Sequence, residues 1–185
     1  INGINEIAAD GHGGQYFGTI DLDAVLAGRT PGAGQLFHLA ADGAVNCAYP
    51  KVGFANGMVL SADGSTLYLN ESFDGTYAFD VAPDGDLSNR RRILVKPDCD
   101  GMALDCEGNV WVTGFQSSHL TRLSPSGEEM EPVATLAPAI TQIRFGGDDM
   151  RDVYITAVPA DAGERLAVGK LPEGEVSFLF GGRSS

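Results

Sequence analysis

Short alternations of apolar and polar residues recur along the chain, separated by turn residues. In residues 54–70, an apolar stretch that ends at Leu60 is followed by Asp63-Gly64 and then by a second alternation up to Asn70. Asp-Gly pairs tolerate the positive backbone φ that tight hairpin turns need. The segment therefore predicts two antiparallel strands joined by a tight turn.

This hairpin pattern occurs four times. Equivalent apolar residues that open the four copies are 51, 44 and 41 residues apart: Ile7, Met58, Met102 and Ile143. A period of about 40–50 residues is typical of β-propellers, in which each blade is a four-stranded antiparallel sheet. We predict one all-β propeller domain over residues 1–185, with blades at 4–50, 51–97, 98–138 and 139–180.

Three further strands follow the opening strand of each unit. The predicted second strands are 15–19, 66–70, 110–114 and 152–156, the third are 35–39, 76–80, 120–123 and 166–170, and the fourth are 45–49, 91–95, 132–136 and 175–180. Residues 22–27 predict one short helical turn, and residues 181–185 predict a frayed tail. No apolar run is long enough to cross a bilayer.

Composition agrees with this fold and limits the classes of molecule that the protein is expected to bind. The 185 residues include 25 Gly and 9 Pro, as expected for many short strands joined by turns. A formal net charge of −13 should repel nucleic acid and anionic membrane surfaces, and it favours cations among small ligands. Three cysteines without CxxC spacing indicate a reducing, cytoplasmic environment.

Four phrases at blade spacing resemble one family. Residues 54–58, 87–91, 100–112 and 145–148 are similar to motifs of the senescence-marker-protein (SMP-30, regucalcin), gluconolactonase and luciferin-regenerating-enzyme-like family. The resemblance implies a full fold of six blades, of which this chain contains four and lacks the N-terminal ones. An arc of four blades leaves open edges, through which self-association is expected.

The resemblance also implies an activity and a cofactor. Family members hydrolyse lactones or related esters, with one divalent metal ion in the central channel that polarises the carbonyl. Matched by motif, Asn56 and Asp100 are the expected metal ligands, Asp100 is the expected catalytic base, and Asn5 is the expected substrate contact. Ca²⁺ is the first expectation, with Mg²⁺, Mn²⁺ or Zn²⁺ as alternatives.

Two departures from the family pattern concern this site. The metal-binding Glu of the family belongs to the first blade, upstream of the matched region. Gly3 stands where relatives that hydrolyse sugar lactones carry a basic residue, and Glu6 stands where Asp is more common. A sugar lactone is therefore not the required substrate.

The repeat supports the same ring of residues independently of the family. Asn5, Asn56, Asp100 and Thr141 occupy equivalent positions, so they should point toward one axis. Carboxylate and amide oxygens suit Ca²⁺, Mg²⁺ or Mn²⁺. Strand alternation would turn Glu6 away if Asn5 faces the axis, so Glu6 is a weaker substrate candidate.

Several alternatives stay open at this point. His119, between two strands of its blade, is a further substrate candidate. Asn56-Gly57 and Asp100-Gly101 also fit simple turn formers, which need no ligand. The competing function is a propeller that binds a small molecule or a divalent cation without turnover, or an inactive fragment.

Overall fold

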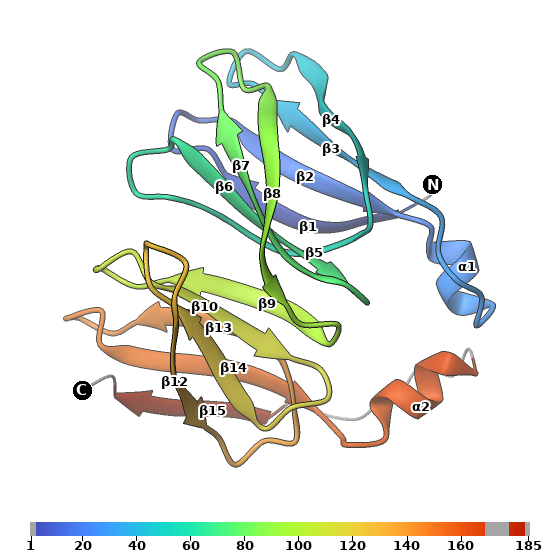
Figure 1. Cartoon of the computed structure of the whole chain (residues 1–185), viewed down its shortest axis with the longest axis vertical. Coiled ribbons are helices and arrows are strands. Elements are labelled where there is room, and N and C mark those ends of the chain that lie inside the picture. The colour runs from blue at the N-terminus through green and yellow to red at the C-terminus, as the bar shows by residue number, and fades with distance from the viewer. Residues whose placement is uncertain (1–2, 169–177, 184–185) are drawn as a thin grey trace.

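The computed structural model describes residues 3–168 and 178–183. It contains four antiparallel sheets, each with its strands in chain order (Figure 1). The first sheet comprises β1 (Gly3–Ala9), β2 (Gln15–Ile20), β3 (Gly34–Leu39) and β4 (Val45–Val52). The second comprises β5 (Phe54–Leu60), β6 (Thr66–Ser72), β7 (Gly75–Val81) and β8 (Leu87–Val95). The third comprises β9 (Cys99–Leu104), β10 (Val110–Gly114), β11 (His119–Leu123) and β12 (Glu129–Ala134), and the fourth comprises β13 (Ala139–Gly146), β14 (Asp152–Val158) and β15 (Phe178–Arg183).

The sheets confirm the predicted class of an all-β protein built from antiparallel blade-like units. Besides strands, the described residues form two short helices, α1 (Leu22–Leu26) and α2 (Ala162–Ala167). The Asp21 side chain caps α1 by accepting a hydrogen bond from the Ala24 N–H, 3.1 Å away, so the predicted helical turn is confirmed. Within the described residues, no helix has the length and apolar character that a membrane span requires.

The prediction for the fourth unit was wrong beyond its second strand. Residues 162–167 are helical where a third strand over 166–170 was expected, and residues 169–177 lie outside the described part of the chain. An ion pair of 2.9 Å between Arg165 and Asp161, one helical turn apart, supports α2. β15 then takes the third position beside β14, so the expected fourth strand at 175–180 and the frayed tail were also misplaced.

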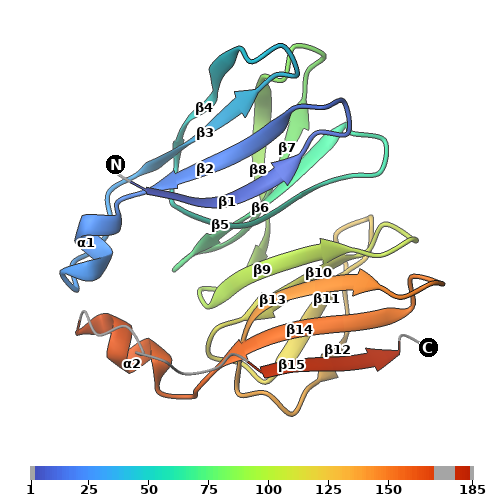
Figure 2. The same ribbon diagram turned by 180° about the vertical axis from the view of Figure 1, so that it is seen from behind.

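The first strands of the sheets lie next to one another. β1 contacts β5, β5 contacts β9, and β9 contacts β13. In Figure 2 these four strands lie where the upper and lower pairs of sheets meet, and we call them the inner strands. Apolar side chains pack between neighbouring sheets, with Leu36 and Phe79 in one buried cluster and Trp111 and Ile143 in another.

Every inner strand carries a β-bulge at the same level. The pairing register shifts between Ile4 and Glu6 in β1, between Ala55 and Met58 in β5, between Cys99 and Met102 in β9, and between Ile140 and Gln142 in β13. A bulge leaves a residue unpaired and breaks the alternation of faces. The bulged segments contain the four ring positions that the repeat predicts, namely Asn5, Asn56, Asp100 and Thr141.

Two glycines beside these positions let the inner strands approach closely. A Cβ on Gly57 would lie 2.4 Å from the Asp100 carbonyl oxygen, and a Cβ on Gly101 would lie 2.6 Å from the Thr141 carbonyl oxygen. Neither glycine adopts a left-handed φ, and both lie within strands. Asn56-Gly57 and Asp100-Gly101 are therefore not turns, and that alternative was wrong. Their glycines are needed for interstrand contact.

Candidate functional site

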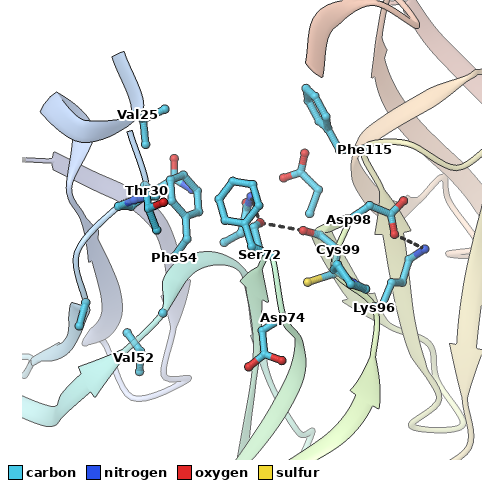
Figure 3. Close-up of a pocket in the computed structure, with 18 of the residues that line it drawn as sticks. Val25, Thr30, Val52, Phe54, Ser72, Asp74, Lys96, Asp98, Cys99 and Phe115 are labelled. Atoms are coloured by element: carbon cyan, nitrogen blue, oxygen red, sulfur yellow. Dashed lines mark hydrogen bonds and ion pairs between the residues drawn. The ribbon is translucent and has the colours of Figure 1, made fainter. Parts of the chain in front are cut away.

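A cleft of about 1870 Å³ opens beside the first residues of β1, β5 and β9. Asn5, Asn56 and Asp100 line it, together with residues of the β6–β7 turn, the β8–β9 loop and the loop after α1. His119, the first residue of β11, also lines the cleft and is half-buried. Figure 3 shows Ser72 next to Cys99, with Phe54 on one side of this pair and Asp98 on the other.

A chain of two hydrogen bonds fixes the amide of Asn56. The Asn56 Nδ2 donates to Ser72 Oγ at 3.0 Å, and the Ser72 hydroxyl donates to the Cys99 carbonyl at 2.8 Å. Because Ser72 uses its one proton on Cys99, it acts as the acceptor for Asn56. This assigns the amide orientation and leaves Asn56 Oδ1 as an acceptor for another group.

Asp100 is the acidic member of the ring. Burial raises the pKa of its carboxyl to about 7, the Glu6 and Asp98 carboxylates add to this rise, and a hydrogen bond from Asn56 opposes it. The Asp100 main chain is held by Asn70, whose Nδ2 donates to the Asp100 carbonyl at 2.8 Å. A carboxyl group that lines a cleft and has a strongly raised pKa is typical of functional sites.

Asn5 connects the first two inner strands at the edge of the cleft. Its Nδ2 donates to the Ala55 carbonyl at 3.0 Å, next to Asn56 in the chain. The Asn5 side chain is exposed, so its oxygen is accessible from the cleft. The structure therefore brings Asn5, Asn56 and Asp100 to one cavity.

Glu6 does not line this cleft. The bulge at Asn5 interrupts the alternation that would have turned Glu6 outward, and Glu6 is half-buried. Its Oε2 lies 3.5 Å from Gln142 Nε2 of β13, and the Arg144 charge also acts on its carboxyl. Glu6 thus lies between inner strands and acts on Asp100 through charge, which the alternation rule did not predict.

An ion pair supports the loop that precedes Asp100. Lys96 Nζ, on a side chain that is almost fully buried, donates to Asp98 Oδ1 at 3.0 Å and to Ser117 Oγ at 2.9 Å. The Gln116 N–H donates to Asp98 Oδ2 at 3.1 Å. These bonds join the β8–β9 and β10–β11 loops. No sequence motif marks them, because the partners are brought together only by the sheet.

The donor set fits a hard cation. No three His, Cys, Asp or Glu side chains gather closely enough for a metal within residues 3–168 and 178–183. Asn56 Oδ1 is oriented by Ser72, and Asp100 supplies a carboxylate beside it. Oxygen donors of this kind suit Ca²⁺, which takes about six to eight ligands, so these two residues would supply only part of a coordination sphere.

Comparisons with known proteins agree with this geometry. The family model for the SMP-30/gluconolactonase/LRE-like region matches residues 1–159. Pentonolactonase XacC of Haloferax volcanii is 27% identical over 181 residues, which are 94% of this chain and 60% of that protein. Regucalcin of Danio rerio is 32% identical over 157 residues, which are 80% of this chain and 52% of that protein.

A solved structure gives the same result. A luciferin-regenerating enzyme superposes with a TM-score of 0.75 at 29% identity, over 83% of this chain and 53% of that one. The chain thus spans about half to three fifths of the length of these relatives. Its match over residues 1–159 and its propeller-type sheets show that the chain belongs to the SMP-30/gluconolactonase/LRE-like family.

Proposed function

We propose that the whole protein is a metal-dependent hydrolase of a lactone or related ester, with its reaction centre in this cleft. The observation that carries the proposal is the convergence of Asn56 and Asp100, from equivalent bulges of β5 and β9, on one cavity. The lactonase among the relatives supports a small-molecule lactone as substrate. Because the chain spans about half to three fifths of these relatives, the activity is proposed for the whole protein.

Each residue of the ring has a distinct role in this proposal. Asn56 Oδ1 and the Asp100 carboxylate hold the divalent cation, with Ca²⁺ as the first choice. Such a cation polarises a carbonyl and acidifies bound water. Asp100 accepts the proton of the attacking water at a carboxylate oxygen, and the Asn5 amide orients the substrate at the edge of the cleft. His119 is kept as a substrate contact from the cleft wall, and Glu6 acts on Asp100 through charge.

Removal of the metal tests the proposal. A chelator is expected to lower the rate of lactone hydrolysis at least about 100-fold, because the carbonyl then loses its polarising charge, and added Ca²⁺ should restore the rate. The measurement is a pH-indicator assay over a panel of lactones, with and without chelator. A bound cation without chelator-sensitive turnover of any lactone would favour the alternative, a non-catalytic binding propeller.

Ser72 should affect metal affinity without touching the metal. Replacing Ser72 by Ala removes the acceptor that orients Asn56, so the Ca²⁺ dissociation constant is expected to rise about 10-fold or more. Isothermal titration calorimetry measures this change. Ser88→Ala, on the exposed side of β8, is the matched control and should keep the original affinity. Equal affinity in Ser72→Ala would mean that Asn56 is oriented by other contacts.

Location and assembly remain part of the proposal. A reducing, cytoplasmic location is proposed, which the free thiols of Cys47, Cys99 and Cys106 support. Self-association through open sheet edges stays a prediction, which light scattering can check.

A further inference from the structure

Aromatic side chains line the cleft beside the polar residues Asn5, Asn56 and Asp100. Phe54, Phe73 and Phe115 all line the cleft. The rings of Phe54 and Phe73 meet edge to face, with centroids 5.8 Å apart and an interplanar angle of 78°. Phe73 is 71% exposed, which is unusual for so large an apolar side chain.

The backbone at Phe73 is strained. Phe73 is the third residue of the turn Glu71–Asp74, which is closed by the Asp74 N–H donating to the Glu71 carbonyl at 3.1 Å. Its φ is +76°, a value that normally requires Gly or Asn at this turn position. The Phe73 N–H donates to the Pro97 carbonyl at 2.7 Å, which fixes the turn against the β8–β9 loop.

This combination points to ligand contact. A strained backbone is kept where the surroundings or a function require it, and an exposed ring gains little from packing in the folded protein. Glycine would fit the turn without strain. The strain that Phe73 introduces is therefore explained by a role of its phenyl ring. The ring lines the cleft, where it can pack on a bound molecule.

The aromatic pair lies directly beside the polar ring. Phe54 pairs with Ser72 in the register of β5 and β6, and Ser72 donates and accepts the bonds that orient Asn56. Figure 3 shows Phe54 beside Ser72 in the cleft. Phe54 and Phe73 are therefore within reach of the substituent of a molecule whose carbonyl contacts Asn56 and Asp100.

We propose that this site accepts lactones or esters with an aromatic or bulky apolar substituent, which packs on Phe54 and Phe73. The substrate class rests on the proposed hydrolase function. Ring packing of this kind contributes specificity for the substituted molecule over a small, unsubstituted one.

A matched pair of substrates tests this specificity. With the whole protein and Ca²⁺, kcat/KM is expected to be about tenfold higher for γ-phenyl-γ-butyrolactone than for γ-butyrolactone. Phe73→Gly removes the ring and suits the positive φ, so it should fold and should reduce this ratio about fivefold or more. Phe54→Leu is a second variant that should also reduce the ratio. Phe37→Leu removes one ring of the stacked pair Phe17 and Phe37, away from the cleft, and should leave the ratio unchanged.

Binding without turnover separates this inference from the proposed hydrolase. Calorimetry compares the binding of 5-phenyl-2-pyrrolidinone with that of 2-pyrrolidinone. These lactams have the shapes of the two lactones but resist hydrolysis. Tighter binding of the phenyl lactam that is lost in Phe73→Gly supports the inference, whether or not any lactone is hydrolysed. Absence of lactone hydrolysis would overturn only the proposed hydrolase function. Turnover or binding without phenyl preference overturns the inference, as does an equal loss of preference in Phe37→Leu.

Discussion

Asp100→Asn is expected to lower kcat/KM for lactone hydrolysis by at least about 1,000-fold in the whole protein, because it removes a proton acceptor and a charged metal ligand together. The substitution keeps the shape of the side chain, so the hydrogen bond from Asn70 to the Asp100 carbonyl can persist. It also removes a partly buried carboxyl whose ionisation burial opposes. The Asp100→Asn variant should therefore keep the melting temperature of the original protein. A loss of rate would then reflect the missing carboxylate rather than unfolding.

Asp74→Asn is the matched control for this experiment. Asp74 also lines the cleft, but its carboxylate is occupied by the Tyr77 hydroxyl at 2.5 Å and by Arg92 at 2.8 Å. The control should lose far less activity than Asp100→Asn. Steady-state kinetics, with thermal denaturation as the check on folding, compares the two variants. If a folded Asp100→Asn protein kept activity within tenfold of the original, Asp100 would not be the catalytic base.

Much of the fold follows from the sequence because the sheets are meanders joined by short turns. In the first three units, alternation set the strands, and turns such as Asp42-Gly43 and Asp63-Gly64 set their ends. Both glycines have the positive φ that this assignment requires. In the fourth unit, Leu166 and Ala167 were assigned to a strand, but the segment 162–167 is rich in residues with high helix propensity. Periodicity over so few residues does not separate the two states.

The ring of candidate ligands could be predicted, but its immediate surroundings could not. The repeat placed Asn5, Asn56, Asp100 and Thr141 at one level, and the structure brings the first three to one cleft. Thr141 does not line that cleft, and its hydroxyl instead contacts the Thr156 hydroxyl at 2.8 Å. The bulges had no readable signal, since an extra residue in a strand changes register without changing composition. The contact of Glu6 with Gln142 of β13 could therefore not be predicted. Ser72 and the strained Phe73 acquire their roles only when β6 lies beside β5 and the β8–β9 loop.

Gly57→Ala is expected to destabilise the protein by about 3 kcal/mol, because a new methyl group would meet backbone atoms that cannot rotate away. The added Cβ would lie 2.4 Å from the Asp100 carbonyl oxygen and 2.7 Å from the Met102 nitrogen. Relief requires β5 and β9 to separate, which shifts Asp100 relative to Asn56. The same substitution should therefore weaken Ca²⁺ binding as well as folding. Urea denaturation and calorimetry measure the two effects.

Gly43→Ala distinguishes this clash from the general cost of replacing a glycine. Gly43 has a φ of +90°, and no atom lies within 4 Å of the methyl group that alanine would add, so the variant meets backbone strain alone, about 1 kcal/mol. It lies in the β3–β4 turn, and Ca²⁺ affinity should be unchanged. If Gly57→Ala were no more destabilising than Gly43→Ala, β5 and β9 could separate at little cost. The close approach of these two strands at Gly57 would then not be what holds Asn56 beside Asp100. A larger loss with weakened Ca²⁺ binding would show that the glycine after Asn56 sets the spacing of the site.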